Sequence, residues 1–379
     1  MTKLIILLTI YTINLSASET IIIPSFLQEQ RTFVLEGQKV YSVAIASNGN
    51  IFAGTDSGLF FKPNDSQEWK QIPGIDSPTY FVSTFVNKVV AISGRLSKNI
   101  LVNGKTNFIV DNKVIQTVKI PNNLKIDVSQ CDFIVTGFQG IIGNSDDLFK
   151  FHLGTNRMLG EKYIKPTSIN LGHGNISQLF AKSNQSIYVA SEMGLFQKKG
   201  KSWQKIDPSS GNRSWALADC RSVAVDSKNR LWFASPQGVG VLDGKEWALY
   251  EGKDGLPYND FTKMATGING DVWFGTKKGA IHFDGDIWEY RQGKRWLPDD
   301  HVNDIAVAKD GSVWIATSKG LSHIYKEKMT LAEKAKWYED EIDRYHRRTP
   351  YEFVLEVSLP APADKSSVRQ RDSDNDGLW

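Results

Sequence analysis

One sequence unit recurs along most of this chain, and this recurrence limits the fold more than any other feature. Each copy has an alternating apolar strand, a polar turn, a more continuously apolar strand, and then Thr/Ser-x-x-Gly before a third strand. Such turns at short, regular spacing are typical of β-hairpins. The second-strand residues Trp232, Trp273 and Trp314 lie 41 residues apart. A period of about 40–45 residues with three or four strands predicts the blades of a β-propeller.

Seven copies of the unit begin near residues 40, 81, 126, 176, 221, 261 and 302. The copies near 81 and 126 have diverged from this pattern. In the copy near 126, Val135-Thr136-Gly137 and Gly140 match the end of the second strand and the glycine that follows it. We therefore expect an all-β fold, a seven-bladed β-propeller of four-stranded blades, over residues 19–326. A single blade cannot bury both faces, whereas blades stacked in a ring can.

Two further features concern how the blades pack and how the ring closes. Trp203, Trp247 and Trp288 each lie 15 residues after the second-strand aromatic of their own copy. We expect these tryptophans to pack one blade against the next. The last copy loses its β pattern soon after Ile324 and lacks an outer strand, while residues 21–35 read as extended and belong to none of the copies. We expect this N-terminal segment, within residues 19–38, to supply the missing strand.

The repeat resembles a known family, the two-component-regulator propeller repeat, over roughly residues 36–325. The pattern D-G-x-V/L-W-I/F-G/A-T-x-x-G-L/V is best matched by Asp310-GSVWIATSKG-Leu321 and Gly270-DVWFGTKKG-Ala280. That family is best known as the extracellular sensor half of bacterial hybrid sensors, and the resemblance implies an extracellular propeller. No kinase, membrane span or response-regulator segment follows, so the resemblance does not carry over a sensor role.

The N-terminus predicts export. Residues 1–18 have Lys3, then the apolar run Leu4–Ile13, then small residues around Ala17, as in a cleaved secretory signal. Ten apolar residues are too few to span a membrane, so we expect a secreted, monomeric, extracellular protein. Its net charge of +3 gives no electrostatic footprint for nucleic acid. In a eukaryote, four Asn-x-Ser sequons would accept glycans: Asn64, Asn175, Asn184 and Asn212.

The two cysteines and the C-terminal segment, residues 327–379, leave alternatives open. Cys131 and Cys220 are expected as buried thiols, with a disulfide as the alternative. Thr330 and Glu333 form a capping box that predicts an amphipathic helix over 330–347, followed by a strand at 351–359. The final DSDNDGLW matches either the start of a calcium loop, which lacks its last ligand, or the entrance of a helical domain that follows such propellers. In the second case the chain is a fragment or a shortened relative.

No catalytic motif is present: the chain has no G-x-S-x-G, no H-E-x-x-H and no paired C-x-x-C. His282 and His323 are repeat equivalents, expected to pack in strands rather than to bind metal. Propellers usually bind ligands at one face and the central channel. The loops expected there carry eight candidate ligand-binding residues, which could alternatively be turn and capping residues: Arg221, Asn259, Asp260, Lys277, Lys278, His301, Asn303 and Asp304.

Three functions fit this pattern. The first is a secreted binding module for a protein or glycan partner, recognising a saccharide or a peptide end, without a cofactor or chemistry of its own. The second is a propeller enzyme, lyase- or lactonase-like, that holds a divalent cation in the channel. The third is a remnant of a larger carbohydrate-active protein. Three or more carboxylate, Asn or His side chains converging on one point in the channel would favour the second.

Overall fold

The computed structural model describes residues 24–120, 125–136, 139–143, 148–152, 164–167, 174–183, 186–200, 202–210, 213–215 and 218–348. These residues fall into two compact units. One contains Gln30–Tyr325 and the other contains residues 24–29 and 326–348. The predicted signal peptide, the sequons at Asn184 and Asn212, and the tail after residue 348 lie outside the described residues.

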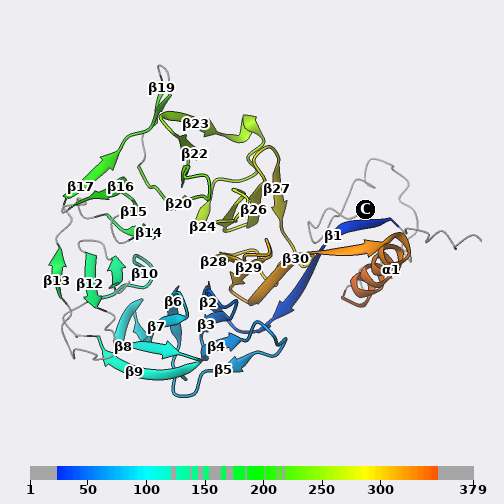
Figure 1. Ribbon diagram of the computed structural model, residues 1–379, viewed down its shortest axis with the longest axis horizontal. Coiled ribbons are helices and arrows are strands. Elements are labelled where there is room, and N and C mark those ends of the chain that lie inside the picture. The colour runs from blue at the N-terminus through cyan, green and yellow to red at the C-terminus, as the bar shows by residue number, and fades with distance from the viewer. Residues whose placement is uncertain are drawn as a thin grey trace, which may run out of the picture. The chain divides into compact units, whose positions relative to one another are not determined.

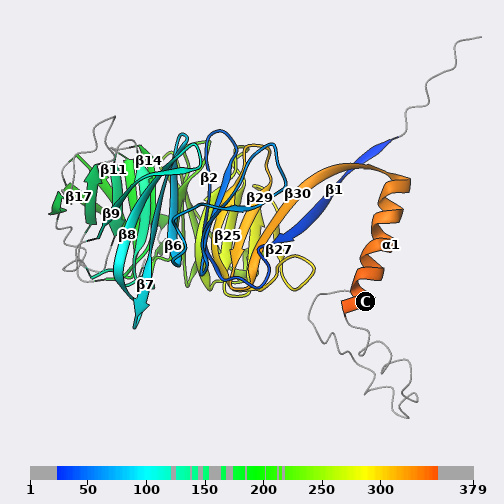
Figure 2. The same ribbon diagram turned by 90° about the horizontal axis from the view of Figure 1, so that it is seen from below.

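The larger unit is a β-propeller of four-stranded antiparallel sheets, which confirms the predicted all-β class. Figure 1 shows the sheets arranged in a ring, with strands β2, β6, β10, β14, β20, β24 and β28 innermost. Figure 2 shows the ring edge-on, with the β7–β8 hairpin projecting beyond its neighbours. Six sheets, called blades 1–6, each use four strands that are consecutive in the chain.

Blades 1–3 occupy the first half of the ring. Their strands are β2 (Val40–Ile45), β3 (Ile51–Thr55), β4 (Gly58–Lys62) and β5 (Lys70–Gln71) in blade 1; β6 (Thr79–Phe85), β7 (Lys88–Ser97), β8 (Ile100–Val110) and β9 (Lys113–Lys119) in blade 2; and β10 (Asp132–Thr136), β11 (Gln139–Gly143), β12 (Leu148–His152) and β13 (Ile164–Thr167) in blade 3.

Blades 4–6 follow, with a small hairpin of β18 (Ser209–Ser210) and β19 (Arg213–Ser214) and the 3-10 turn η1 (Gly252–Asp254) between them. Their strands are β14 (Ile176–Ser183), β15 (Ser186–Ser191), β16 (Gly194–Lys199) and β17 (Ser202–Ile206) in blade 4; β20 (Ser222–Val225), β21 (Leu231–Ser235), β22 (Gly238–Asp243) and β23 (Glu246–Tyr250) in blade 5; and β24 (Phe261–Thr266), β25 (Val272–Thr276), β26 (Gly279–Phe283) and β27 (Trp288–Arg291) in blade 6.

The last four-stranded sheet is composite. Strands β28 (Val302–Val307), β29 (Val313–Thr317) and β30 (Gly320–Thr330) are joined by β1 (Ser25–Val34), which pairs with β30. The sequence predicts seven blades, whereas the described residues form six blades of four consecutive strands. The last repeat supplies three strands to the composite sheet, and the N-terminal end of the described chain supplies the fourth. The N-terminal strand occupies the outer position left open in the last repeat, as predicted from the missing strand and the unassigned extended segment at residues 21–35.

Blade 3 corrects a second expectation. Val135 and Thr136 were aligned with the second strand of the repeat, but they lie in β10, the innermost strand, and β11 begins only at Gln139. The physical reason is that Val128–Ile141 contains an apolar strand without a polar turn of its own. An alternating apolar run does not say by itself which position in the sheet it occupies.

Aromatic side chains fill the spaces between blades from both sides. The fully buried Trp232 of blade 5 meets Phe283 of blade 6, with ring centroids 5.8 Å apart. In the same interface Trp288 of blade 6 packs back onto Tyr250 of blade 5 at 5.4 Å. The outer-strand tryptophans therefore contact the preceding blade, and the second-strand tryptophans contact the following one.

His282 and His323 also serve packing, as expected. His282 stacks on Trp273 with ring centroids 4.4 Å apart, and His323 stacks on Trp314 at 4.0 Å with the rings only 8° from parallel. Both histidines lie on the third strand, beside the tryptophan of the second. Burial lowers the pKa of His323 to about 4, against the opposing effect of Asp310 nearby.

This histidine makes stability depend on pH. A pKa of about 4 in the folded state against about 6.5 in the unfolded state means that the unfolded chain binds the proton first on acidification. The contribution of His323 to the free energy of unfolding is therefore present above pH 6.5 and is lost between pH 6.5 and 4. We expect His323→Phe, which keeps the stack on Trp314, to reduce the loss of unfolding free energy over this window by about 2 kcal/mol, allowing for partial exposure. Urea unfolding at pH 7, 5.5 and 4.5 measures it; parallel wild-type and variant profiles would contradict it.

Cys131 and Cys220 are both buried free thiols, which confirms the prediction of buried thiols over the alternative of a disulfide. Burial raises the pKa of the Cys131 and Cys220 thiols far above its usual range. A thiol that stays protonated is a poor nucleophile and a poor metal ligand. Both side chains therefore act as small apolar groups in the core.

The smaller unit contains the outer parts of β1 and β30 and the helix α1 (Leu331–Arg348). The predicted capping box is present: the Thr330 N–H donates to Glu333 Oε2 at 2.8 Å, and the Glu333 N–H donates to Thr330 Oγ1 at 3.3 Å. On the apolar face of the helix, Leu331 is 64% exposed and Tyr338 58% exposed. Over the described residues, no helix combines the length and apolar character needed to cross a membrane.

Candidate ligand site at the channel mouth

The first strands of the seven sheets surround a central channel that contains a cavity of about 970 Å³. Each inner strand is the edge of its sheet, so the N–H groups on its channel side have no partner within that sheet. An unpaired buried N–H is costly. Polar side chains from the neighbouring sheet satisfy several of these groups, and this requirement places polar residues at the start of the inner strands.

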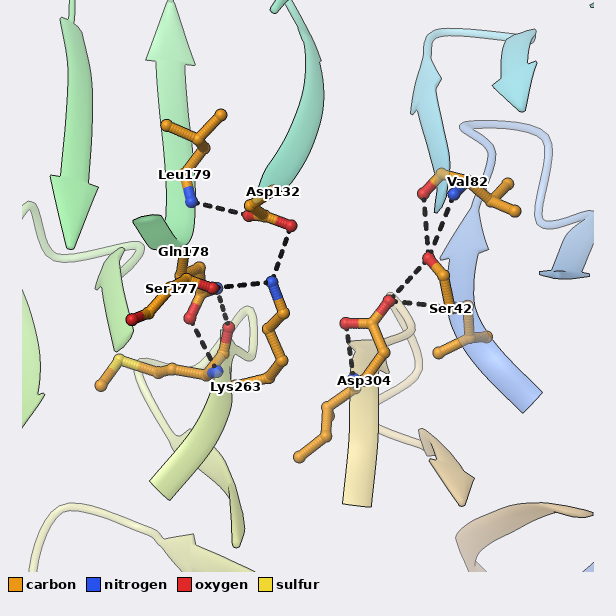
Figure 3. Close-up of polar contacts among 11 residues, drawn as sticks. Ser42, Val82, Asp132, Ser177, Gln178, Leu179, Lys263 and Asp304 are labelled. Atoms are coloured by element: carbon orange, nitrogen blue, oxygen red, sulfur yellow. Dashed lines mark hydrogen bonds and ion pairs between the residues drawn. The ribbon is translucent and has the colours of Figure 1, made fainter. Parts of the chain in front are cut away.

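Asp304 of β28 and Ser42 of β2 show the pattern where the composite sheet meets blade 1 (Figure 3). Asp304 Oδ2 accepts from the Val43 N–H at 3.0 Å and from the Ser42 hydroxyl at 2.8 Å. Ser42 Oγ in turn accepts from the Val82 N–H of blade 2 at 3.1 Å. Asp304 Oδ1 accepts from its own neighbour, the Ile305 N–H, at 2.9 Å. Burial raises the pKa of the Asp304 carboxyl, and the nearby Lys263 ammonium opposes this rise.

The opposite side of the channel repeats the pattern with Asp132 of β10 and Gln178 of β14 (Figure 3). Asp132 Oδ2 accepts from the Leu179 N–H of blade 4 at 2.7 Å. The Gln178 amide exchanges two hydrogen bonds with the backbone of Met264 in β24, at 2.8 and 3.0 Å. Blade 4 therefore bonds to blade 6 directly, past the short inner strand of blade 5.

Lys263 of β24 departs from the pattern because an ammonium cannot accept a hydrogen bond. It reaches towards blade 3 instead, where its Nζ lies 2.7 Å from Asp132 Oδ1, and it also donates to the Ser177 carbonyl at 3.2 Å. The ion pair joins strands 131 residues apart in the chain. It forms a polar layer of the channel together with Asp304, just inside the loops that lead into the inner strands.

The mouth of the channel is formed by the loops before the first strands and after the second strands. Backbone hydrogen bonds tie these loops together: the Asp56 N–H donates to the Lys39 carbonyl, and the Lys277 N–H to the Asp260 carbonyl, at 3.1 and 3.3 Å. These backbone bonds place the two sets of loops on one face of the ring.

Five of the eight candidate residues line the cavity: Arg221, Lys277, His301, Asn303 and Asp304. The other three lie on neighbouring loops of the same face. Asn259 donates from Nδ2 to the Pro236 carbonyl at 2.6 Å, the Asp260 carbonyl accepts from the Lys277 N–H at 3.3 Å, and the Lys278 ammonium lies 5.5 Å from the ring centre of Tyr258. The structure gives Asp304 and Asn303 roles in holding the ring, since Asn303 Nδ2 donates to the Val40 carbonyl at 2.7 Å.

The polar groups at the mouth are grouped by charge. On blades 4 and 5 the acids are engaged: Asp219 pairs with Arg221 at 2.8 Å, and Glu192 accepts from Asn175 Nδ2 at 2.6 Å. On blade 6 and the composite sheet, Lys277 and His301 are exposed. The described part of the mouth therefore offers basic groups to solvent on one side and paired acids on the other.

Blades 1 and 2 contribute a third, aromatic side. Tyr41 and Tyr80 line the cavity with ring centroids 4.8 Å apart, and Leu96 reaches the mouth from the β7–β8 hairpin. Burial, and then the neighbouring Tyr41, raise the pKa of Tyr80 to about 12. Both phenols are thus neutral hydrogen-bonding groups, and the exposed Lys39 ammonium lies 5.1 Å from the centre of the Tyr41 ring.

Sequence reasoning missed the polar layer formed by Ser42, Asp132, Gln178 and Lys263. A signal was present for three of them, because a polar residue stands near the start of each clear inner strand, where Asp304 stands in the last copy. Asp132 was hidden by the misassigned strand in blade 3. Of the two described sequons, Asn64 is exposed, whereas the Asn175 amide nitrogen is engaged by Glu192.

Comparison with known proteins agrees with the fold and with the repeat. Residues 297–319 match the family model of the two component regulator propeller, which confirms the resemblance in the last repeat. A search of curated proteins found no match.

Among solved structures, a streptogramin B lyase is similar at 13% identity with a TM-score of 0.58, covering 80% of this chain and 98% of that one. The extracellular domain of the putative one component system BT4673 from B. thetaiotaomicron is similar at 15% identity with a TM-score of 0.56, over 78% of this chain and 39% of that chain. YCF48 bound to D1 peptide is similar at 13% identity with a TM-score of 0.53, over 78% and 96%. Identities this low show a shared propeller fold and no shared activity.

Proposed function

We propose that this chain is a secreted binding module that takes a polar ligand, a saccharide or a peptide end, at the mouth of its central channel and performs no chemistry on it. The observation that carries this proposal is the cavity of about 970 Å³, a size that suits a ligand of several rings or residues. Its mouth combines exposed basic groups, neutral phenols and apolar side chains, which suits recognition of polar and apolar parts together.

The bonding of the channel carboxylates supports binding over metal-dependent catalysis. Asp304 accepts three hydrogen bonds, and Asp132 is held by the Lys263 ammonium and the Leu179 N–H. A divalent cation would have to displace these donors, which hold neighbouring blades together. Within the described ranges, no group of three His, Cys, Asp or Glu residues has a geometry that could hold a metal ion. The lyase-like alternative draws support from the fold alone.

Substitution at the mouth tests the proposal. Lys277→Ala with His301→Ala removes two exposed side chains that line the cavity and make no bond in the polar layer. We expect the affinity for a saccharide or peptide found with the wild-type chain to fall about tenfold, the loss of one to two polar contacts, with the melting temperature unchanged. The matched control is Lys245→Ala, an exposed lysine on the β22–β23 turn, outside the cavity lining. Equal affinities for the mouth variant and the control would contradict binding at this site.

A further inference from the structure

Four cationic side chains and one histidine lie beside the channel mouth on the loops of blade 6 and the composite sheet. We call this group the basic face, and its residues are Lys277, Lys278, Arg295, His301 and Lys319. The two lysines follow β25, Arg295 and His301 lie between β27 and β28, and Lys319 follows β29. Arg295 is half-buried and the other four side chains are exposed.

Hydrogen bonds show that these loops form one continuous surface. The Gly279 N–H, next to the two lysines, donates to the Asp300 carbonyl at 2.8 Å, and Lys319 Nζ lies 3.3 Å from Asp299 Oδ2. The Tyr258 hydroxyl donates to Gln292 Oε1 at 3.2 Å and so connects the loop before β24 to the loop before β28.

The acidic residues in this region hold the loops. Asp300 Oδ1 accepts from the Gly293 N–H at 2.7 Å, and Asp299 Oδ1 accepts from the His301 N–H at 3.0 Å. Asp260 has one carboxylate oxygen buried. Two carboxylates beside the basic face are thus used within the loops, and one of them, Asp299, also pairs with Lys319. The positive charge of the basic face therefore comes mainly from Lys277, Lys278 and Arg295.

Aromatic rings lie under two of the cations. The Lys278 ammonium stands 5.5 Å from the centre of the Tyr258 ring, and Arg295 lies 5.3 Å from the centre of the half-buried Trp296 ring. Such cation–π contacts fix a long side chain near one position and leave its outer hydrogens available to a ligand. The rings also add apolar surface next to the charges.

We infer that the basic face binds a linear polysaccharide with repeating anionic groups, carboxylate or sulfate, which runs across blade 6 into the channel mouth. Spaced cations suit charges spaced along a chain, and the rings offer the apolar contact that the C–H face of a sugar ring makes. The five residues lie on three loops of two neighbouring sheets, an arrangement that suits a ligand with several charges along its length. The inference rests on the proposed function, because the channel mouth shares Lys277 and His301 with the basic face.

The test measures affinity of the mature full chain for four immobilised probes: polygalacturonate, heparin, neutral dextran and inorganic polyphosphate, at 50 and 300 mM NaCl. We expect binding to polygalacturonate or heparin that weakens with salt, because exposed charges are screened, and no binding to dextran or polyphosphate. Lys278→Glu with Arg295→Glu should weaken this binding about tenfold or more, since each reversal replaces an attraction by a repulsion. Lys113→Glu with Lys245→Glu changes the net charge equally on other hairpin turns and should stay within about twofold of wild type.

Each other outcome overturns the inference. Absence of binding to both polysaccharides at 50 mM NaCl would contradict the inference. An equal loss of affinity in the two double variants would show a general effect of net charge. Polyphosphate binding as tight as that of either polysaccharide would show that the sugar is not recognised. The neutral variant Lys278→Gln with Arg295→Gln, measured alongside its melting temperature, shows whether a loss of binding is caused by misfolding. Because neither substituted residue lines the cavity, failure here with retained binding of a neutral ligand at the mouth leaves the proposed function standing.

Discussion

Starting the chain at residue 35 instead of residue 24 should lower its melting temperature by about 10 °C or more. This deletion removes β1, the fourth strand of the composite sheet, and exposes the edge of β30. It also removes Val34, which packs against the buried cluster around Trp314 and Leu321. The remaining three strands would hold the last sheet against blade 1 through β28 and β29, where Trp69 of blade 1 meets Trp314.

Differential scanning calorimetry of the two chains measures this effect. A synthetic peptide with the sequence of residues 24–34, added in excess, should restore part of the melting temperature, and a scrambled peptide should not. Equal melting temperatures for the two chains would show that β1 does not close the ring.

Trp232→Ala should lower the free energy of unfolding by about 3–5 kcal/mol, the range for truncating a fully buried large aromatic. The side chain is 0% exposed, stacks on Tyr250, meets Phe283 of the next blade and donates from Nε1 to the buried Asp226 at 2.8 Å. The substitution leaves a cavity between blades and a carboxylate that has lost one donor.

The control is Trp247→Ala on the outer strand β23, where the indole is only half-buried. Its cost should be smaller, about 1–2 kcal/mol, because less apolar area is lost. Urea unfolding of both variants gives the comparison. A Trp232→Ala cost no larger than that of Trp247→Ala would mean that the second-strand tryptophans do not carry the packing between blades.

The fold was largely predictable because its determinants are local and repeated. The turn after each first strand, the apolar second strand and the glycine after it place three strands of each clear copy within about 25 residues. The N-terminal closure was predictable because the last copy lacked one strand and residues 21–35 belonged to none. Blade 3 was misassigned because the stretch around Val135 has lost the polar turn that marks where a strand begins.

The channel was predictable only in part, since its bonds join residues far apart in the chain. Loop residues such as Lys277 and His301 could be placed at the mouth by position in the repeat. The bond from Lys263 to Asp132 could not, because it depends on which inner strands approach each other. The bond from Gln178 to Met264, past the four-residue strand β20, could not be predicted for the same reason.

The most direct test of a binding function at the channel mouth is an array of glycans and peptides probed with the purified chain from residue 24 onward and with its Lys277→Ala, His301→Ala variant. We expect the wild-type chain to bind at least one saccharide or peptide reproducibly. The same signal should be lost in the Lys277→Ala, His301→Ala variant and kept in Lys245→Ala. Absence of any signal above background, or a signal that all three proteins share, would contradict it.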